Sequence, residues 1–268
     1  PLDLGSLSQA QIVILDTTLT GQRLTISQLP RAPLVIRLFS GIKLDQQGLE
    51  LENCGALLLA GSPQAVKLMA QSLRAVRTCA GSEPSALERR RLAPPFVFDP
   101  QLAQAHQDAV FSNNAWLAQR LTQVQGGLLA RVVHPSLGNS QDWACAPFVV
   151  LHLKDSSIEA HRQLTAVLEY EAQRRKLPLG RGASFGFLDH RHEFVIPVLR
   201  ENRALFKVAM GARQGDPREA IGQLLLEVLS YPDCASLALA YPDLQLASAP
   251  ADWAAPSARL LEFLEGSD

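Results

Sequence analysis

The sequence of 268 residues contains little cysteine and no long hydrophobic run. Its cysteines are far apart and form no Cys-x-x-Cys pair, which argues against a structural zinc site or a redox dithiol. No apolar stretch approaches the roughly 18 residues of a membrane-spanning helix, and the N-terminus does not have the pattern of a signal peptide. We therefore predict a cytoplasmic protein with reduced thiols and no membrane association. The cysteines are Cys54, Cys79, Cys145 and Cys234.

An excess of charge of one sign is also lacking. The chain has 25 Lys and Arg residues against 26 Asp and Glu residues, a formal net charge of -1. A nucleic-acid-binding surface would need a basic excess on one face, so we predict no nucleic-acid partner. We also predict no metal site. In particular, we expect His190 and His192 to point to opposite faces of a strand, which would make them a poor pair of metal ligands.

Short, continuous apolar runs are present in the first third of the chain. They predict strands that are buried on both faces, and they cover residues 11–16, 34–39 and 56–61. Ser62 and Pro63 provide an N-cap and a first helical position for a helix over residues 64–76. Strands that alternate with helices favour an α/β layer with a mostly parallel sheet.

The remainder of the chain has a different pattern. We predict a connection over residues 78–100, in which the basic run Arg89-Arg90-Arg91 is a solvated face, and then a helix over residues 101–124. Strands then outnumber helices, which favours an α+β domain with helices on one face of a largely antiparallel sheet. These strands are 128–134, 148–153, 183–187, 193–198 and 205–210, and the helices are 157–175 and 217–229.

These patterns divide the chain into four parts. We predict an α/β unit over residues 1–80, followed by a linker and an inter-domain helix over residues 81–125. A small α+β domain follows over residues 126–230. The tail over residues 231–268 is predicted to be loop-like, except for a short helix at 257–264.

Three residues with useful chemistry lie at the ends of the first two predicted strands. Asp16 ends the first strand, and Ser40 and Lys43 follow the second. In an open α/β sheet, ligands bind at the carboxyl ends of the strands. A pyridoxal-phosphate (PLP) enzyme needs a lysine that forms an imine with the cofactor, an acid near the pyridine nitrogen and donors for the phosphate. From spacing alone, an ordinary strand-end carboxylate and a surface lysine are the more common explanation of the pattern.

The local sequences around these residues resemble a known family. The run Ile12-Val13-Ile14-Leu15-Asp16-Thr17-Thr18, followed by Phe39-Ser40-Gly41-Ile42-Lys43, is similar to the fold-type I PLP enzymes of Cys/Met metabolism, which include the cystathionine synthases and lyases. The resemblance implies that Lys43 forms the Schiff base with PLP. It also implies that Asp16 faces the pyridine nitrogen and that Thr18 and Ser40 bind the cofactor. The first unit would then be part of the family's large, PLP-binding domain.

The resemblance continues downstream and covers roughly residues 10–230, in the family's order. The similar segments begin at Asn114, Val133, Gly182 and Leu205. Ser184 lies where the family has a serine that helps to hold the substrate carboxylate. Lys207 replaces the arginine that grips this carboxylate, and Arg191 is the alternative ligand, because lysine lacks the bidentate fork of arginine.

Two further departures concern the cofactor. Ile42 replaces a hydroxyl residue before the lysine, and the first half of the large domain, which supplies the phosphate-binding turn, has no counterpart before Asp16. The chain begins at Pro1 rather than Met, which suggests a processed, split or excised polypeptide. We therefore expect a C-terminal portion that needs an N-terminal half or a second polypeptide, in a dimer or higher oligomer. Uncovered strand edges and apolar surface would favour this association.

The resulting prediction is a PLP-dependent lyase or transferase that acts on an amino acid. The alternative is a non-catalytic subunit that keeps the PLP fold and scaffolds a partner chain. An unrelated α/β hydrolase or nucleotide-binding module is less well supported, because the sequence has no G-x-S-x-G motif and no P-loop. The sequence identifies neither the substrate nor the reaction type.

Overall fold

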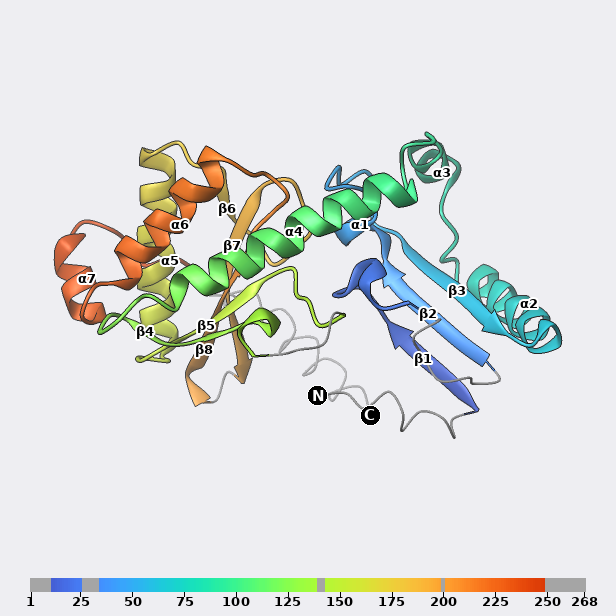
Figure 1. The fold of residues 1–268 in the computed structure, drawn as a ribbon, viewed down its shortest axis with the longest axis horizontal. Coiled ribbons are helices and arrows are strands. Elements are labelled where there is room, and N and C mark those ends of the chain that lie inside the picture. The colour runs from blue at the N-terminus through green and yellow to red at the C-terminus, as the bar shows by residue number, and fades with distance from the viewer. Residues whose placement is uncertain (1–10, 26–33, 139–142, 199–200, 249–268) are drawn as a thin grey trace, which may run out of the picture.

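The computed structural model describes residues 11–25, 34–138, 143–198 and 201–248. They form two lobes, each built on its own sheet, and helix α4 (Pro100–Leu121) runs from one lobe to the other (Figure 1). The side chain of Asp99 caps α4 by accepting hydrogen bonds from the backbone N–H groups of Gln101 and Leu102, and Pro100 occupies the first turn. The predicted helix over residues 101–124 is therefore confirmed, although it ends at Leu121.

The smaller sheet has the order β1 (Ile12–Asp16), β2 (Leu34–Ser40) and β3 (Gly55–Gly61), so the three predicted strands are confirmed. β1 and β2 are parallel, whereas β3 is antiparallel to β2. The expectation of a mostly parallel sheet therefore holds for one of the two pairings. After β2 the chain passes through the short helix α1 (Gly41–Leu44) and returns as β3.

Burial of this sheet on both faces was predicted and is wrong for its two outer strands. Ile14 of β1 is 66% exposed, and Leu57 of β3 is 51% exposed. Helix α2 (Pro63–Cys79) follows β3 and is capped by Ser62, as the sequence predicts, but it buries none of its residues. Side chains of a strand project from the faces of the sheet, so this exposure shows that the described residues leave part of these faces uncovered.

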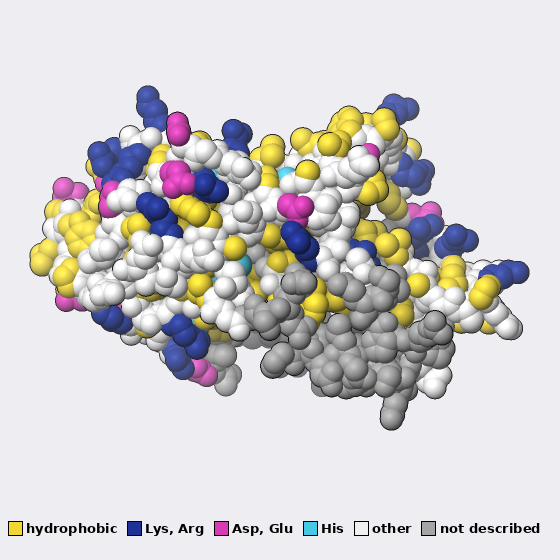
Figure 2. Space-filling view, viewed as in Figure 1, with side chains coloured by type: hydrophobic (Ala, Val, Ile, Leu, Met, Phe, Trp, Pro, Cys, Tyr) yellow, Lys and Arg dark blue, Asp and Glu magenta, His cyan; other side chains and the backbone are white. Residues whose placement is uncertain are grey.

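The connection between the lobes is partly helical, as expected. Helix α3 (Ala86–Leu92) begins with a reciprocal capping box between Ser85 and Glu88. The basic run Arg89–Arg91 is exposed, as predicted. Leu87 and Phe96 nearby are also exposed, and hydrophobic side chains are visible on the surface of this lobe (Figure 2).

The larger sheet has five strands and lies within the region that was predicted as the α+β domain. In space, the strand order is β4-β5-β8-β7-β6, and every pairing is antiparallel except that of β6 with β7. The strands are β4 (Leu129–Val133), β5 (Val149–Leu153), β6 (Leu179–Arg181), β7 (His190–Val198) and β8 (Arg203–Ala209). Helices α5 (Ile158–Arg174) and α6 (Asp216–Leu229) close one continuous hydrophobic core with this sheet and the end of α4.

Buried asparagines fix α4 to this sheet. The side-chain amide of Asn114 donates to the backbone carbonyl of Met210 (2.8 Å), and its oxygen accepts from the Met210 N–H (3.0 Å). Asn113 donates to the carbonyls of Gly211 and Arg213. Buried polar groups must be paired, so these bonds specify how α4 meets the end of β8.

Three predictions about this region are wrong. Residues 183–187 form a loop rather than a strand, and the left-handed backbone at Gly186 (φ 80°) shows how the extended run is interrupted. Helix α7 (Cys234–Ala240) lies in the predicted loop-like tail and is capped by Asp233. His190 and His192 are both buried on one face of β7, because residues two apart on a strand share a face.

Other predictions remain open. The predicted helix at 257–264 lies outside the described residues. No described helix is long and apolar enough to cross a membrane, and the described residues hold no cluster of three or more metal-ligating side chains. The boundaries of the four predicted parts stay predictions.

Candidate functional site

Lys43 lies in the short helix α1, directly after β2, and faces the other lobe. Its ammonium group contacts the hydroxyl of Ser184, which lies in the loop between β6 and β7. The rings of Phe185 and Phe187 lie on the same loop, with centroids 5.6 and 5.9 Å from Lys43 Nζ. The structure therefore brings the predicted cofactor lysine and one predicted substrate-binding residue together from different lobes.

The surroundings of Lys43 lower the pKa of its ammonium group. Partial burial is the largest cause, followed by the positive charges of Lys207 and Arg191, while the carboxylate of Glu50 opposes them. Lowering the pKa of an amine favours its neutral, nucleophilic form over the ammonium form.

Arg191, the second predicted substrate-binding residue, lies on β7. Its Nη2 donates to both carboxylate oxygens of Glu50, at 2.9 and 3.0 Å. The guanidinium lies 3.9 Å from the centroid of the Phe187 ring. Arg191 therefore belongs to the same group of side chains as Lys43.

Lys207, the third predicted substrate-binding residue, has different partners. It lies on β8 directly opposite Glu193 of β7 and forms an ion pair with it. Its ammonium also donates to the backbone carbonyl of Ala183 (2.6 Å). Because Ala183 precedes Ser184, Lys207 holds the backbone beside the hydroxyl that contacts Lys43.

Asp16, Thr18 and Ser40 meet at the carboxyl ends of β1 and β2. Thr18 Oγ1 accepts a hydrogen bond from the Ser40 N–H (3.0 Å), and the Asp16 carboxylate accepts one from the Thr18 N–H (2.8 Å). Asp16 is exposed. These residues lie at the same end of the small sheet, as predicted, and the chain continues from Ser40 into α1 and Lys43.

The loop between β6 and β7 approaches Lys43 closely because Gly186 has no side chain. A Cβ atom at this position would lie 2.2 Å from the carbonyl oxygen of Lys43. The carbonyl of Gly186 bonds to Nε2 of the buried His106 on α4 (2.8 Å). Burial lowers the pKa of His106, so this histidine is neutral at neutral pH. α4 and a glycine therefore place the loop against the lysine.

Several residues of this group were missed by sequence reasoning. Phe185 and Phe187 lie within the segment Gly182–Phe187 that carried the family resemblance, but no role was predicted for their rings. Glu50 and Glu193 have no local sequence signal, because each is defined by a partner on a distant element.

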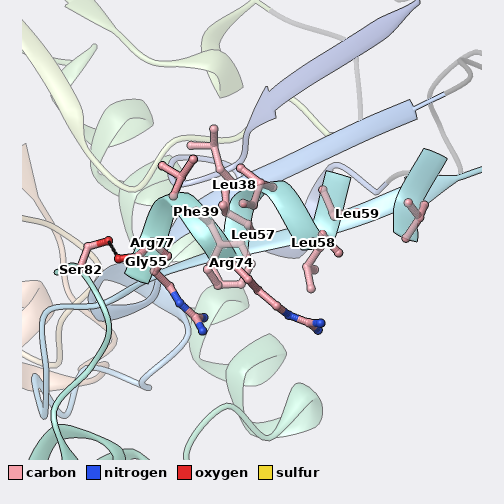
Figure 3. A pocket seen from close by; sticks show the side chains of 14 residues that line it. Leu38, Phe39, Gly55, Leu57, Leu58, Leu59, Arg74, Arg77 and Ser82 are labelled. Carbon is pink, nitrogen blue, oxygen red and sulfur yellow. Dashed lines mark hydrogen bonds between the residues drawn. The ribbon is translucent and has the colours of Figure 1, made fainter. Parts of the chain in front are cut away.

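A cavity of about 980 Å³ lies elsewhere, between α2 and the small sheet (Figure 3). Its lining is mostly apolar and includes Leu57, Leu59 and Leu73, with Arg74 and Arg77 also present. None of the predicted site residues lines it. The cavity follows from the loose contact between α2 and β3 and leaves apolar surface open on this lobe.

Comparison with known proteins gives no match to a family model or to a curated protein sequence. Solved structures do match. A methionine gamma lyase from Micromonospora echinospora has a TM-score of 0.58 and 19% identity, over 88% of this chain and 59% of the other. A cystathionine gamma synthase from Xanthomonas oryzae pv. oryzae, solved with cystathionine, has a TM-score of 0.51 and 14% identity, over 84% and 66%.

A third match is a protein from Campylobacter jejuni that is described as an O-acetylhomoserine (thiol)-lyase and contains N'-pyridoxyl-lysine-5'-monophosphate. It has a TM-score of 0.51 and 13% identity, over 84% of this chain and 61% of the other. The chain spans about three fifths of the length of the methionine gamma lyase. It therefore has the fold of the Cys/Met-metabolism PLP enzymes over part of their length, as the sequence resemblance predicts.

Proposed function

We propose that this chain is the C-terminal portion of a PLP-dependent lyase or transferase that acts on an amino acid. The observation that carries the proposal is the position of Lys43. It follows a strand of the small sheet, contacts Ser184 from the other lobe and has a lowered pKa. A surface lysine at a strand end would need neither the contact nor the surrounding cations.

The described residues could bind part of the cofactor, but not all of it. Lys43 would bind it covalently and then move a proton at Nζ, and the exposed carboxylate of Asp16 would hold the pyridine nitrogen protonated. Thr18 and Ser40 would lie on the cofactor side of the strand ends. Bound PLP would supply an electron sink for the substrate. The fit is incomplete, because the described residues contain no glycine-rich turn after a strand to cradle the phosphate.

A second polypeptide, or an N-terminal portion of the same one, would complete the site. Two observations support this part of the proposal. The small sheet has free edges at β1 and β3 with exposed Ile14 and Leu57, and the matched methionine gamma lyase is much longer than this chain. Pairing at these edges would bury apolar surface and satisfy backbone groups. The cytoplasmic location and a dimer or higher oligomer stay predictions.

The test is covalent labelling of the full chain together with its N-terminal portion. We expect a yellow protein after addition of PLP, and borohydride should fix the pyridoxyl group on Lys43, as read by peptide mass spectrometry. Lys43→Ala should lose both signals, whereas Lys67→Ala, at an exposed lysine of α2, should keep them. Labelling on a different lysine would contradict the proposal.

The alternative, a non-catalytic subunit with the same fold, is favoured by one observation. Lys207 stands in the place of the carboxylate-binding arginine, and it is engaged by Glu193 and by the carbonyl of Ala183. A complex that contains the N-terminal portion and takes up no PLP would support this alternative.

A further inference from the structure

The two cations beside Lys43 have different freedom to bind a ligand. Lys207 is largely enclosed, with its side chain 14% exposed, and its ammonium is shared between Glu193 and the Ala183 carbonyl. The Phe148 ring covers it further, at 5.4 Å from the centroid. A carboxylate that approached Lys207 would have to break an ion pair and release the loop that carries Ser184.

Arg191 has a single acidic partner and a more open position. Only its Nη2 is engaged, by Glu50, in the hydrogen bonds found among the described residues. The Glu50 side chain is 44% exposed and that of Arg191 is 26% exposed. The flat guanidinium lies over Phe187, which fixes its plane, and its Nε and Nη1 groups make no hydrogen bond among the described residues.

Glu50 is held in this position by an unusual backbone. Its φ of 51° is in the left-handed region, which costs a non-glycine residue free energy. The same turn contains Gly48, whose φ is 75° and which packs directly against the backbone of Leu188. The turn after Lys43 therefore packs against the loop between β6 and β7, and it places the carboxylate of Glu50 beside Arg191.

We propose that Arg191 binds the α-carboxylate of the amino acid and that Glu50 occupies this place until the substrate displaces it. Lys207 is then a positioning residue that holds the Ser184 loop. This inference rests on the proposed function, since it assigns the substrate end of the same site. The exchange replaces one carboxylate by another on the same guanidinium. An exposed ion pair of this kind is weak, so the displacement costs little.

The experiment is a titration of the PLP-free full chain, so that its result does not depend on cofactor uptake. L-alanine is the probe and L-alaninamide, which lacks the carboxylate, is the matched ligand. The readout is the NMR signal of the Arg191 Nε–H group, assigned by its loss in Arg191→Gln. We expect L-alanine to shift this signal and L-alaninamide to leave it unchanged.

Substitutions then distinguish the role of Arg191 in carboxylate binding from that of Lys207. Glu50→Gln should tighten L-alanine binding about two- to fivefold, because the competing carboxylate is removed. Arg191→Gln should abolish the preference for L-alanine over L-alaninamide, measured on backbone amide signals. The pair Asp189 and Arg213 nearby provides matched controls, and neither Asp189→Asn nor Arg213→Gln should alter the binding.

The role of Lys207 has its own readout. Lys207→Met should keep the preference for L-alanine and raise the pKa of Lys43, read from the titration of the Lys43 side chain by NMR, because a nearby positive charge is removed. Lys207→Arg should restore the original pKa.

Three results would overturn the inference. They are a preference for L-alanine that survives Arg191→Gln, one that is lost only in Lys207→Met, and the absence of any preference in the unmodified chain. The outcome is distinguishable from failure of the proposed function, because borohydride labelling of Lys43 with PLP is scored separately.

Discussion

Burial of an unpaired histidine in the larger lobe makes stability depend on pH. His192 is fully buried, and neither of its ring nitrogens has a hydrogen-bond partner among the described residues. Its ring stacks on Phe206, with centroids 5.7 Å apart. Burial lowers the pKa of His192 to about 4, with a smaller contribution from Arg181.

The direction of the effect follows from proton binding. In the unfolded chain, the pKa of a histidine is about 6.5, so between about pH 6.5 and 4 the unfolded state binds a proton that the folded state rejects. The contribution of neutral His192 to the free energy of unfolding is complete above pH 6.5 and is lost as the pH falls toward 4. The difference of about 2.5 between the pKa in the unfolded and the folded chain corresponds to about 3 kcal/mol, of which about 2 kcal/mol should be lost between pH 7.5 and 5.

His192→Phe tests this reasoning. Phenylalanine keeps a ring that can stack on Phe206 and removes no hydrogen bond. The free energy of unfolding at pH 7.5 should be unchanged or higher, and the decrease between pH 7.5 and 5 should be smaller by about 2 kcal/mol. Urea unfolding at both pH values, followed by far-UV circular dichroism, measures both quantities.

The matched control is His190→Phe. The pKa of His190 is also lowered to about 4 by burial, but its Nδ1 accepts a hydrogen bond from the Gly211 N–H (3.1 Å). This substitution should therefore cost about 1–3 kcal/mol even at pH 7.5, because it leaves a buried N–H unpaired. The explanation is refuted if His192→Phe loses as much stability as the unmodified chain on acidification.

Three further substitutions have defined outcomes. Gly186→Ala should reduce borohydride-fixed PLP on Lys43 and destabilise the fold by at least about 1 kcal/mol, because of the left-handed backbone and the contact with the Lys43 carbonyl; equal labelling would contradict the close approach. Burial raises the pKa of Asp45 to about 6, so its carboxylate opposes folding increasingly as the pH rises from about 4 to about 6, and by a constant amount at higher pH. Asp45→Asn should therefore raise the free energy of unfolding at pH 8 by about 1–3 kcal/mol, and a decrease would show that the attraction to the charge of Arg37 dominates. Ile14→Glu should weaken association with the N-terminal portion in analytical ultracentrifugation without a change in circular dichroism, whereas unchanged association would show that the exposed face of β1 is not in the contact.

The elements of the small sheet could be predicted from the sequence because their signals are local. Short apolar runs mark β1, β2 and β3, and the place of Lys43 after β2 follows from them. The direction of β3 was less predictable. Its apolar pattern is the same whether it runs parallel or antiparallel to β2, so the pattern does not give the direction.

The site itself was only partly predictable. The resemblance named Lys43, Ser184, Arg191 and Lys207, but it could not show that Arg191 pairs with Glu50, since the two residues are 141 positions apart. The loop at 183–187 was predicted as a strand because its apolar residues outweigh the breaks at glycine. Contacts with α4 and with the turn after Lys43 shape it instead.

Helix α4 has a mechanical consequence for the chemistry at Lys43. Its 22 residues span about 33 Å and are held at both ends of the site. Gln107 accepts from the Gln22 N–H in one lobe, and Asn114 is bonded to Met210 in the other. Because one helix is bonded to both lobes, it fixes where the loop that carries Ser184 lies relative to Lys43, and a change in the angle between the lobes would change the contact between these two side chains.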